Sequence, residues 1–441
     1  MNPEAIGRDE YRHRRRRLME RMPAGAVALI PAADTKARSR DVDYLFRQDS
    51  DFWYLTGFSE PGALLALVPG RDDGEAILFC RERDERFELY NGERLGPERA
   101  ADVLSVDRGF PVSEIASVVP GLLEGAAKVC VTLGDYPDFD RDLLKWVSGI
   151  RARESGGVVS PGEFIGLKSL LHEERLIKSP NEQRLLFRAA EISADAHLRA
   201  MRACRPGLSE MQLEAELVHE FMQGGARTPA YPPIVGGGAN ACVLHYTAND
   251  AELRDGDLVL IDAGCELEHY AADLTRTFPV SGRFSGVQRA LYEVVLEAQE
   301  KAIGECVSGA DFNRPHEVGL HAMIEGLVSL GLLDGSLEEI LESGSYTAFC
   351  PHKSCHWLGL DVHDVGGYQV DGRWRKFREG MVLTVEPGLY VRPDMEGVDA
   401  GWRGVGVRIE DDVLIAADGP VVLTAGAPKQ VAEIEAAMNG A

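Results

Sequence analysis

The chain has 441 residues, too many for one ordinary hydrophobic core, so we expect two domains. Its 45% hydrophobic and 27% charged residues are typical of a globular protein, and its net charge of −24 argues against nucleic acid or an anionic membrane surface as a partner. Eight scattered cysteines without a CxxC pair, together with the lack of an apolar leader or a membrane-spanning run, predict a cytoplasmic protein.

The first part of the chain, residues 1–174, alternates two kinds of pattern. Helical periodicity is found at about 7–22, 112–124 and 138–149, and short β-branched or aliphatic runs lie at 26–30, 63–68, 75–80 and 128–133. This alternation predicts an N-terminal α/β domain. Because it contains no phosphate loop, acid/base pair or metal cluster, we expect it to have an accessory role.

Two segments of this domain allow more than one interpretation. The basic run 12–17 could be a targeting signal, but we expect it to form the solvated face of the first helix. The polar and aromatic stretch 47–54 could be a loop that contributes to an interface or a substrate wall, but core and turn packing is the commoner explanation.

A second domain, residues 175–441, is predicted to begin at a strong helix start. Ser179 can cap a helix, Pro180 suits its first position, and Glu182 completes a capping box. The same spacing recurs at 209–212 and 285–288, each before a helical apolar period, and strands then alternate with helices. We therefore expect a second α/β domain.

Five side chains in this second domain are the candidates for chemistry. They lie in or at the ends of short apolar β-type runs, and they are Asp262, Asp273, His356, Glu386 and Glu410. Buried carboxylates lose their charge or find a partner, and no block of Lys or Arg accompanies all five, so a metal ion is the economical explanation. Taken singly, either Glu could pair with an arginine such as Arg408, and Asp262 could simply open a turn.

The spacing of the first two acids favours a site with two metals. Asp262 and Asp273 are eleven residues apart with a polar stretch, 266–269, midway, so they could face each other across a hairpin. Like charges placed opposite each other repel, and two ions roughly 3.5–4 Å apart would remove that penalty. Four oxygen ligands and one imidazole should prefer a hard or borderline divalent ion such as manganese, with cobalt or zinc as substitutes.

Two other motifs are decoys. His316 and His321 belong to an HExxxH string, one residue longer than the HExxH zinc motif, so the two histidines fall on different faces of a helix. The glycines at 236–238 lack the frame of a phosphate loop and predict a tight or flexible turn beside a pocket.

Taken together, the motifs carry a resemblance to a known family. The strings LVLIDAG, ADLTRTFPVSG, HWLGLDVHDVG, LTVEPGLY and GVRIEDD resemble the aminopeptidase P family of metallopeptidases, and CVLHYT and RQDSDFWYLTGFSEP add to the match. The resemblance covers nearly the whole chain. HWLGLDVHDVG is more similar to aminopeptidase P than to prolidase, a relative in the same pita-bread superfamily.

This resemblance implies a C-terminal pita-bread domain with two divalent ions, usually manganese, that removes the first residue of peptides whose second residue is proline. A water held between the ions would attack the carbonyl before proline. The five candidates fall on the metal-ligand positions, with Asp273 and Glu410 as the bridging pair. We expect Glu386 to carry the proton of that water to the proline nitrogen, which is a poor leaving group unless it is protonated.

The resemblance also implies a set of substrate contacts. These are His245, His363, His352, Arg408 and Tyr390. His245 and His363 match histidines that contact the substrate and steady the reacting carbonyl, so we expect both to take part in catalysis. The family's aromatic contribution from a neighbouring subunit corresponds to Tyr90, where relatives have tryptophan, and we expect a homo-oligomer, either dimer or tetramer.

Rival functions use the same fold. Prolidase has the same metals but cleaves only Xaa-Pro dipeptides. A non-catalytic peptide-binding module and a metal-free hydrolase of the creatinase type are expected to have lost ligands, and here all five are intact.

Overall fold

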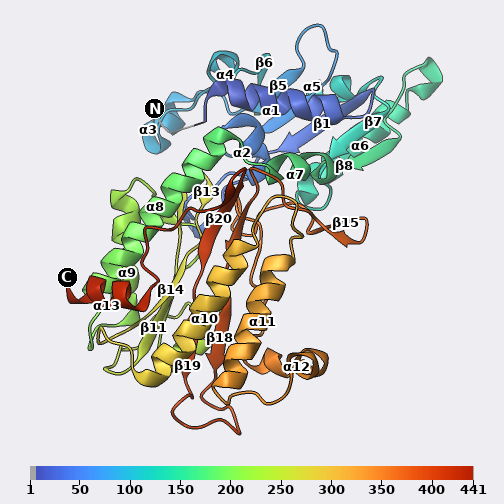
Figure 1. Cartoon of the computed structure of the whole chain (residues 1–441). Helices are drawn as coiled ribbons and strands as arrows, with labels where there is room; N and C mark the ends of the chain where they lie inside the picture. The colour runs from blue at the N-terminus through green and yellow to red at the C-terminus, as the bar shows by residue number, and fades with distance from the viewer. Residues whose placement is uncertain (1–5, 441) are drawn as a thin grey trace. The chain divides into compact units, whose positions relative to one another are not determined.

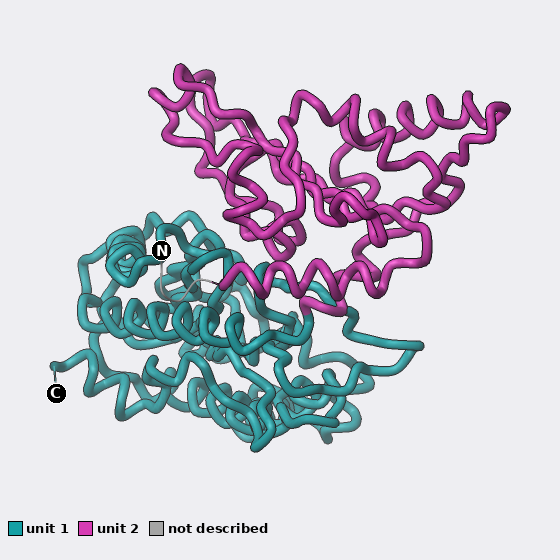
Figure 2. Tube along the Cα trace, turned by 90° about the horizontal axis from the view of Figure 1, so that it is seen from above, with its two compact units in different colours: residues 1–4, 176–441 teal, residues 5–175 magenta. Residues whose placement is uncertain are grey.

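The computed structural model describes residues 6–440 and divides them into two compact units, 6–175 and 176–440 (Figure 1, Figure 2). The division falls at the end of helix α7 (Lys168–Leu176). Within residues 6–440, no helix combines the length and the apolar composition that crossing a bilayer requires. All eight cysteines are free thiols.

The N-terminal unit is built around one six-stranded mixed sheet in the order β6-β5-β4-β1-β7-β8. Its strands are β1 (Ala26–Pro31), β4 (Leu64–Leu67), β5 (Ala76–Cys80), β6 (Arg108–Pro111), β7 (Lys128–Val131) and β8 (Glu163–Gly166), beside a small hairpin of β2 (Ala37–Ser39) and β3 (Val42–Asp43). Besides α7, its helices are α1 (Arg8–Arg21), α2 (Ser50–Thr56), α3 (Glu85–Asn91), α4 (Pro97–Leu104), α5 (Ile115–Leu123) and α6 (Pro137–Arg151). The predicted α/β character of this unit is confirmed.

The basic run 12–17 lies on helix α1, but only part of it is solvated. Arg14 and Arg15 are 4% and 1% exposed. Arg14 donates through Nη1 to Tyr54 O at 3.1 Å, and Arg15 donates through Nη1 to Leu55 O at 2.7 Å. The prediction of a solvated face is wrong for these two arginines, because carbonyl groups distant in the sequence accept their hydrogen bonds.

The stretch 47–54 contains a helix rather than a loop. Helix α2 begins after Asp49, whose carboxylate accepts a hydrogen bond from the N–H of Phe52 at 2.9 Å. Phe52, Trp53 and Tyr54 are buried. The interpretation as core packing is confirmed for residues 50–54, which form a helix, whereas residues 47–49 precede that helix and Arg47 is exposed.

The C-terminal unit packs helices against several small antiparallel sheets, ordered β10-β11-β14, β13-β12-β9, β17-β20-β21 and β18-β19. Its strands are β9 (Thr228–Pro229), β10 (Ile234–Gly237), β11 (Leu258–Asp262), β12 (Cys265–Leu267), β13 (Tyr270–Ala271), β14 (Thr275–Pro279), β15 (Gln369–Val370), β16 (Arg373–Trp374), β17 (Val382–Val385), β18 (Gly388–Val391), β19 (Val405–Arg408), β20 (Asp411–Ala416) and β21 (Gly419–Val422). Its helices are α8 (Pro180–Ala203), α9 (Glu210–Gln223), α10 (Gly286–Gly304), α11 (Arg314–Ser329), α12 (Leu337–Ser343) and α13 (Val431–Asn439). The second α/β domain is therefore present.

Three of these helices begin at the predicted capping boxes. In α8, the N–H of Ser179 donates to Glu182 Oε2 at 2.9 Å, and Ser179 Oγ accepts from the N–H of Glu182. The same reciprocal pair is formed at the starts of α9 and α10. These local signals determine where the helices start. The helices then pack on the strands: α8 contacts β12 and β13, α9 contacts β9 and β10, and α10 contacts β17, β18 and β19. Figure 1 shows α10 beside α11.

The two decoy motifs lie on a helix and at a strand end. The HExxxH residues are on α11, where His316 is buried and its Nδ1 lies 3.2 Å from Ser354 Oγ. The glycines at 236–238 end strand β10 and begin the 3₁₀ helix η3 (Gly238–Cys242). Gly236 approaches the main chain so closely that a Cβ there would lie 2.9 Å from Asn240 O. The predicted tight turn is therefore confirmed.

Candidate metal centre and active site

The five candidate ligands come from strand ends and from one loop. Asp262 is the last residue of β11, Glu386 directly follows β17, and Glu410 lies between β19 and β20. Asp273 precedes β14 by two residues. His356 stands in an irregular segment, held by the N–H of Thr384, which donates to His356 O at 2.9 Å. The expectation of a β-type run at 354–364 is therefore wrong, whereas the other four runs contain strands.

The register between the first two acids differs from the prediction. β11 and β14 are antiparallel as expected, but the residue opposite Asp262 is Thr275, not Asp273. The chain between the acids leaves the sheet to form β12 and β13, which pair with each other, and β12 also pairs with β9. Gly264 permits this crossing, because a Cβ there would lie 1.8 Å from Ala272 O.

The two acids still meet, because a tyrosine bridges them. Tyr231 Oη lies 2.5 Å from Asp262 Oδ1 and 2.5 Å from Asp273 Oδ1. No sequence pattern singles out Tyr231, which precedes two prolines and lies 31 residues before Asp262. Thr275, whose Oγ1 donates to Glu410 Oε2 at 2.7 Å, was also missed, although strand alternation puts it on the same face as Asp273.

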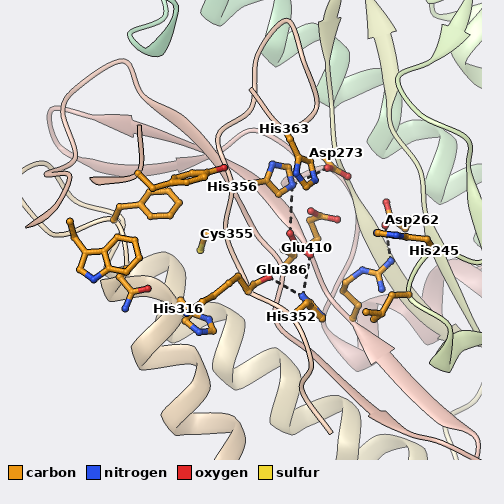
Figure 3. A pocket seen from close by; sticks show the side chains of 17 residues that line it. His245, Asp262, Asp273, His316, His352, Cys355, His356, His363, Glu386 and Glu410 are labelled. Atoms are coloured by element: carbon orange, nitrogen blue, oxygen red, sulfur yellow. Dashed lines mark hydrogen bonds and ion pairs between the residues drawn. The ribbon is translucent and has the colours of Figure 1, made fainter. Parts of the chain in front are cut away.

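The remaining ligands converge on the same point (Figure 3). Ligand atoms of Asp273, His356 and Glu410 all lie within 4.8 Å of one another, and all three side chains are buried. His356 Nε2 lies 3.4 Å from Asp273 Oδ2 and 3.5 Å from Glu386 Oε1. The structure thus gathers the five predicted residues at one site.

The charges at this site call for an additional cation. Burial, together with the Asp273 and Glu386 carboxylates, raises the pKa of Glu410 well above its usual value. Burial also raises the pKa of Glu386 to about 7, even though the charges of His356 and Arg408 oppose the shift. Protein cations alone therefore do not satisfy these carboxylates. An oxygen-rich donor set with one imidazole fits divalent metal ions.

Against the effect of burial, the neighbouring carboxylates also raise the pKa of the His356 imidazole. Burial alone would lower the pKa of His356, but the Asp273 and Glu386 carboxylates outweigh it and raise the pKa to about 9. His356 Nδ1 lies 3.0 Å from Trp357 O, which orients the ring so that Nε2 faces the carboxylates.

The site opens into a cavity of about 440 Å³. Its lining includes the five candidate ligands, the expected substrate residues His245, His352, His363 and Arg408, and a wall of Phe312, Tyr368 and Trp374. In Figure 3, His245 and His316 lie on opposite sides of the carboxylates. The aromatic wall and His316 were not predicted as site residues.

Three of the expected substrate residues are joined by hydrogen bonds, and a fourth, His363, contacts a candidate ligand. The rings of His363 and His356 are stacked, with 3.9 Å between their centroids. Tyr390 is buried, and its Oη lies 2.9 Å from His352 Nε2 and accepts a hydrogen bond from Arg408 Nη1 at 3.0 Å. Tyr90 lies on α3 in the N-terminal unit and is 79% exposed.

Comparison with known proteins identifies the family. Residues 184–417 match the sequence profile of Metallopeptidase family M24, and residues 11–131 match that of the Aminopeptidase P, N-terminal domain. The chain belongs to the aminopeptidase P family of metallopeptidases. The predicted pita-bread fold and metallopeptidase class are therefore confirmed.

Relatives match over almost their whole length. The Xaa-Pro aminopeptidase of Escherichia coli (strain K12) is 46% identical over 437 residues, 99% of each chain, and that of Haemophilus influenzae is 44% identical over 434 residues, 98% of each. Among solved structures, Pseudomonas aeruginosa aminopeptidase PepP superposes with a TM-score of 0.97 at 52% identity, covering 99% of this chain and 98% of that one. Aminopeptidase P from E. coli with the inhibitor Pro-Leu gives 0.95 at 46% identity, with 99% of each chain covered.

Proposed function

We propose that this chain is a metal-dependent Xaa-Pro aminopeptidase, which removes the first residue of peptides whose second residue is proline. The observation that carries the proposal is the convergence of four carboxylates and one imidazole at a cavity, in a chain that aligns over 99% of its length with an Xaa-Pro aminopeptidase. A peptide bond before proline needs a dedicated enzyme, because proline lacks the N–H that proteases use to bind extended chains.

Asp262, Asp273, His356, Glu386 and Glu410 would hold two divalent ions. Manganese is our proposed ion, with cobalt or zinc as substitutes, because the donors are oxygen-rich with a single imidazole. When bound, the ions supply a water of lowered pKa as the nucleophile and polarise the scissile carbonyl.

Glu386 is the proposed proton carrier. Its Oε1 lies at the buried wall of the cavity, 3.5 Å from His356 Nε2. It would accept the proton of the attacking water and deliver it to the proline nitrogen, which leaves only when protonated.

Histidines and the Arg408 group are proposed to bind the substrate. His245 and His363 would donate hydrogen bonds to the carbonyl oxygen as it gains negative charge. His352, Tyr390 and Arg408 are linked through the Tyr390 hydroxyl, so they would move as one unit against the peptide. The negative charge of the ligand set favours a cationic N-terminus, which restricts cleavage to the end of the chain.

We also propose a cellular location and an oligomeric state for the enzyme. The free cysteines agree with a reducing, cytoplasmic location. We also propose a homo-oligomer, dimer or tetramer, in which the exposed Tyr90 would reach the site of a neighbouring subunit. Tyr90→Ala, assayed for activity and oligomeric state by light scattering, tests this part.

A peptide panel tests the activity itself. We expect Xaa-Pro-Xaa tripeptides to lose their first residue, chelator to abolish the cleavage, and added Mn²⁺ to restore it. Glu386→Gln should lose cleavage while still binding metal. Cleavage of Xaa-Pro dipeptides alone would identify a prolidase, and full activity in Glu386→Gln would remove the proposed proton carrier.

A further inference from the structure

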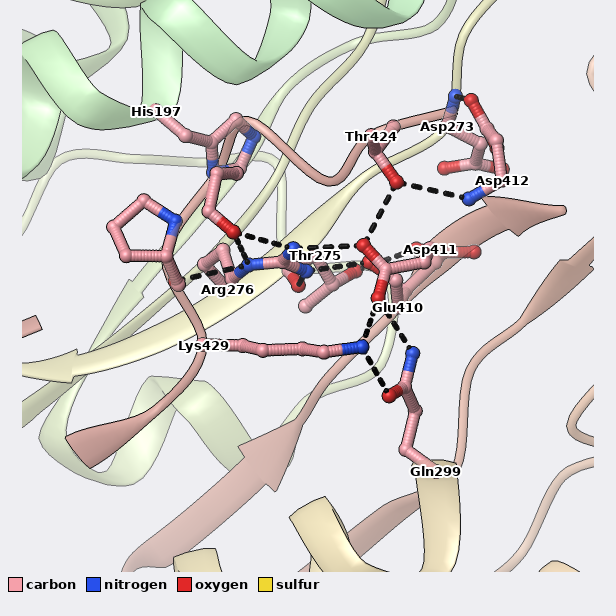
Figure 4. Close-up of polar contacts among 12 residues, drawn as sticks. His197, Asp273, Thr275, Arg276, Gln299, Glu410, Asp411, Asp412, Thr424 and Lys429 are labelled. Atoms are coloured by element: carbon pink, nitrogen blue, oxygen red, sulfur yellow. Dashed lines mark hydrogen bonds and ion pairs between the residues drawn. The ribbon is translucent and has the colours of Figure 1, made fainter. Parts of the chain in front are cut away.

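A second polar cluster lies next to Glu410, and none of its members lines the cavity. Arg276 on β14 and Asp411 at the start of β20 are both fully buried and form an ion pair, with 2.7 Å between Arg276 Nη2 and Asp411 Oδ1 (Figure 4). Burying two charges is costly unless further hydrogen bonds satisfy them. The partners of this pair therefore show what it holds in place.

Arg276 holds the main chain of Glu410. Its Nη1 donates to Glu410 O at 2.6 Å and to Thr275 O at 3.0 Å. The N–H of Glu410 donates to Thr275 O at 3.1 Å, and Thr275 Oγ1 donates to the Glu410 carboxylate. The carbonyl oxygen, the N–H and the carboxylate of Glu410 are thus all held by Thr275 and Arg276, two consecutive residues of β14.

Asp411 ties this arrangement to the C-terminal segment 424–429. Besides Arg276, its carboxylate accepts hydrogen bonds from Thr424 Oγ1 at 2.7 Å, Lys429 Nζ at 2.7 Å and Gln299 Nε2 at 2.8 Å. Arg276 in turn donates to Ala427 O at 2.9 Å. The pair is saturated with partners, and most of them come from one short segment near the end of the chain.

We propose that Arg276, Asp411 and Lys429 form a clamp that positions Glu410 for metal binding. This inference rests on the proposed function of the site. A ligand held in its binding geometry loses little freedom when the ion arrives, and partners behind a ligand typically contribute 10-fold to 100-fold, roughly, in metal affinity or activity. The three clamp residues are positioning residues and touch no substrate.

The competing interpretation is that the pair only stabilises the fold. A purely structural pair would lower the melting temperature of the metal-free protein when broken, and would leave the affinity for metal unchanged. Breaking a clamp would weaken the affinity for metal more than an equally destabilising substitution elsewhere in the protein does. The two interpretations therefore differ in a binding constant and not only in activity.

The test compares Asp411→Asn and Lys429→Met with Tyr292→Phe. Tyr292 Oη donates to the main-chain oxygen of Lys429 at 2.6 Å, so its loss loosens the same segment without breaking the clamp. Dissociation constants for Mn²⁺ are measured by competition with a chromogenic chelator, and melting temperatures are measured on the chelated proteins. Lys429 is half-buried, so Lys429→Met keeps the test open should Asp411→Asn fail to fold.

We expect Asp411→Asn to weaken Mn²⁺ binding roughly 10-fold to 100-fold and Lys429→Met to weaken it less, with no change in Tyr292→Phe. Wild-type affinity in both clamp variants, or an equal loss in Tyr292→Phe, would overturn the clamp. Measurements on the wild-type protein distinguish failure of the clamp from failure of the proposed function. If the wild type binds Mn²⁺ and cleaves Xaa-Pro-Xaa, and the clamp variants keep its Mn²⁺ affinity, the clamp alone is refuted. Wild-type protein without Mn²⁺ binding refutes the proposed function.

Discussion

Arg408 donates a hydrogen bond through Nη2 to Asp262 Oδ2 at 2.6 Å, so the arginine at the site pairs with an aspartate and not with either glutamate. The same guanidinium also donates to Tyr390 Oη and to Thr275 Oγ1. One side chain thus orients a proposed ligand, a substrate residue and the threonine that holds Glu410.

Arg408→Lys should therefore damage the site although it keeps the charge. A lysine cannot reproduce three directed hydrogen bonds from one planar group. We expect kcat/KM for an Xaa-Pro-Xaa peptide at saturating Mn²⁺ to fall roughly 10-fold to 100-fold. Steady-state kinetics check this, and an unchanged kcat/KM would mean that charge alone is required.

Tyr231→Phe removes only the hydroxyl between Asp262 and Asp273. We expect Mn²⁺ affinity to fall about tenfold, because the two carboxylates lose the group that aligns them. Chelator competition measures the affinity. Tyr270→Phe is the matched control, since the buried Tyr270 donates to Glu182 and lines no part of the cavity. Equal affinity losses in both variants would speak against a special role for Tyr231.

How far the sequence predicts such details depends on how local their causes are. The capping boxes at Ser179, Ser209 and Ser285 were predictable, because each helix start is decided within four residues. The candidate ligands were predictable because charge is rare in apolar β runs. The burial of Arg15 and the meeting of Tyr231 with Asp273 were not, because both depend on partners brought together only by tertiary packing.

The contribution of Glu386 to the stability of the metal-free enzyme should fall as the pH rises. Burial raises the folded pKa of Glu386 to about 7, above the unfolded value of roughly 4.3. The resulting stabilisation is complete below the unfolded pKa and is lost as the pH rises through the folded pKa, since the unfolded state releases its proton first. Burial lowers the pKa values of His197, His316 and His352, so their contributions rise over the same pH range. Thermal melts between about pH 5 and about pH 8 should therefore show the Glu386 contribution as a difference between the chelated wild type and a variant without this carboxyl.

Glu386→Gln isolates the contribution of this one carboxyl, because glutamine does not titrate. We expect the melting temperature of the chelated wild type, relative to that of the chelated variant, to fall as the pH rises over this range. Identical pH profiles for the two proteins would mean that Glu386 does not titrate in this window.

The aromatic wall should influence which first residue is accepted. Phe312 and Tyr368 rings pack with 4.6 Å between centroids, and Trp374 is 36% exposed at the cavity. Trp374→Ala should lower kcat/KM for Phe-Pro-Xaa relative to Ala-Pro-Xaa by roughly threefold to tenfold, the range expected for one lost aromatic contact. Competition between the two peptides in one reaction measures the ratio, and an unchanged ratio would exclude the wall from selection.

The most direct measurement is an anomalous difference map of crystals of the Mn²⁺-loaded enzyme. Our account predicts two manganese peaks roughly 3.5–4 Å apart. Each peak should lie within bonding distance of some of the five side chains, which are Asp262, Asp273, His356, Glu386 and Glu410. A map with no peak among these five side chains, in crystals of protein that is active with Mn²⁺, would contradict it.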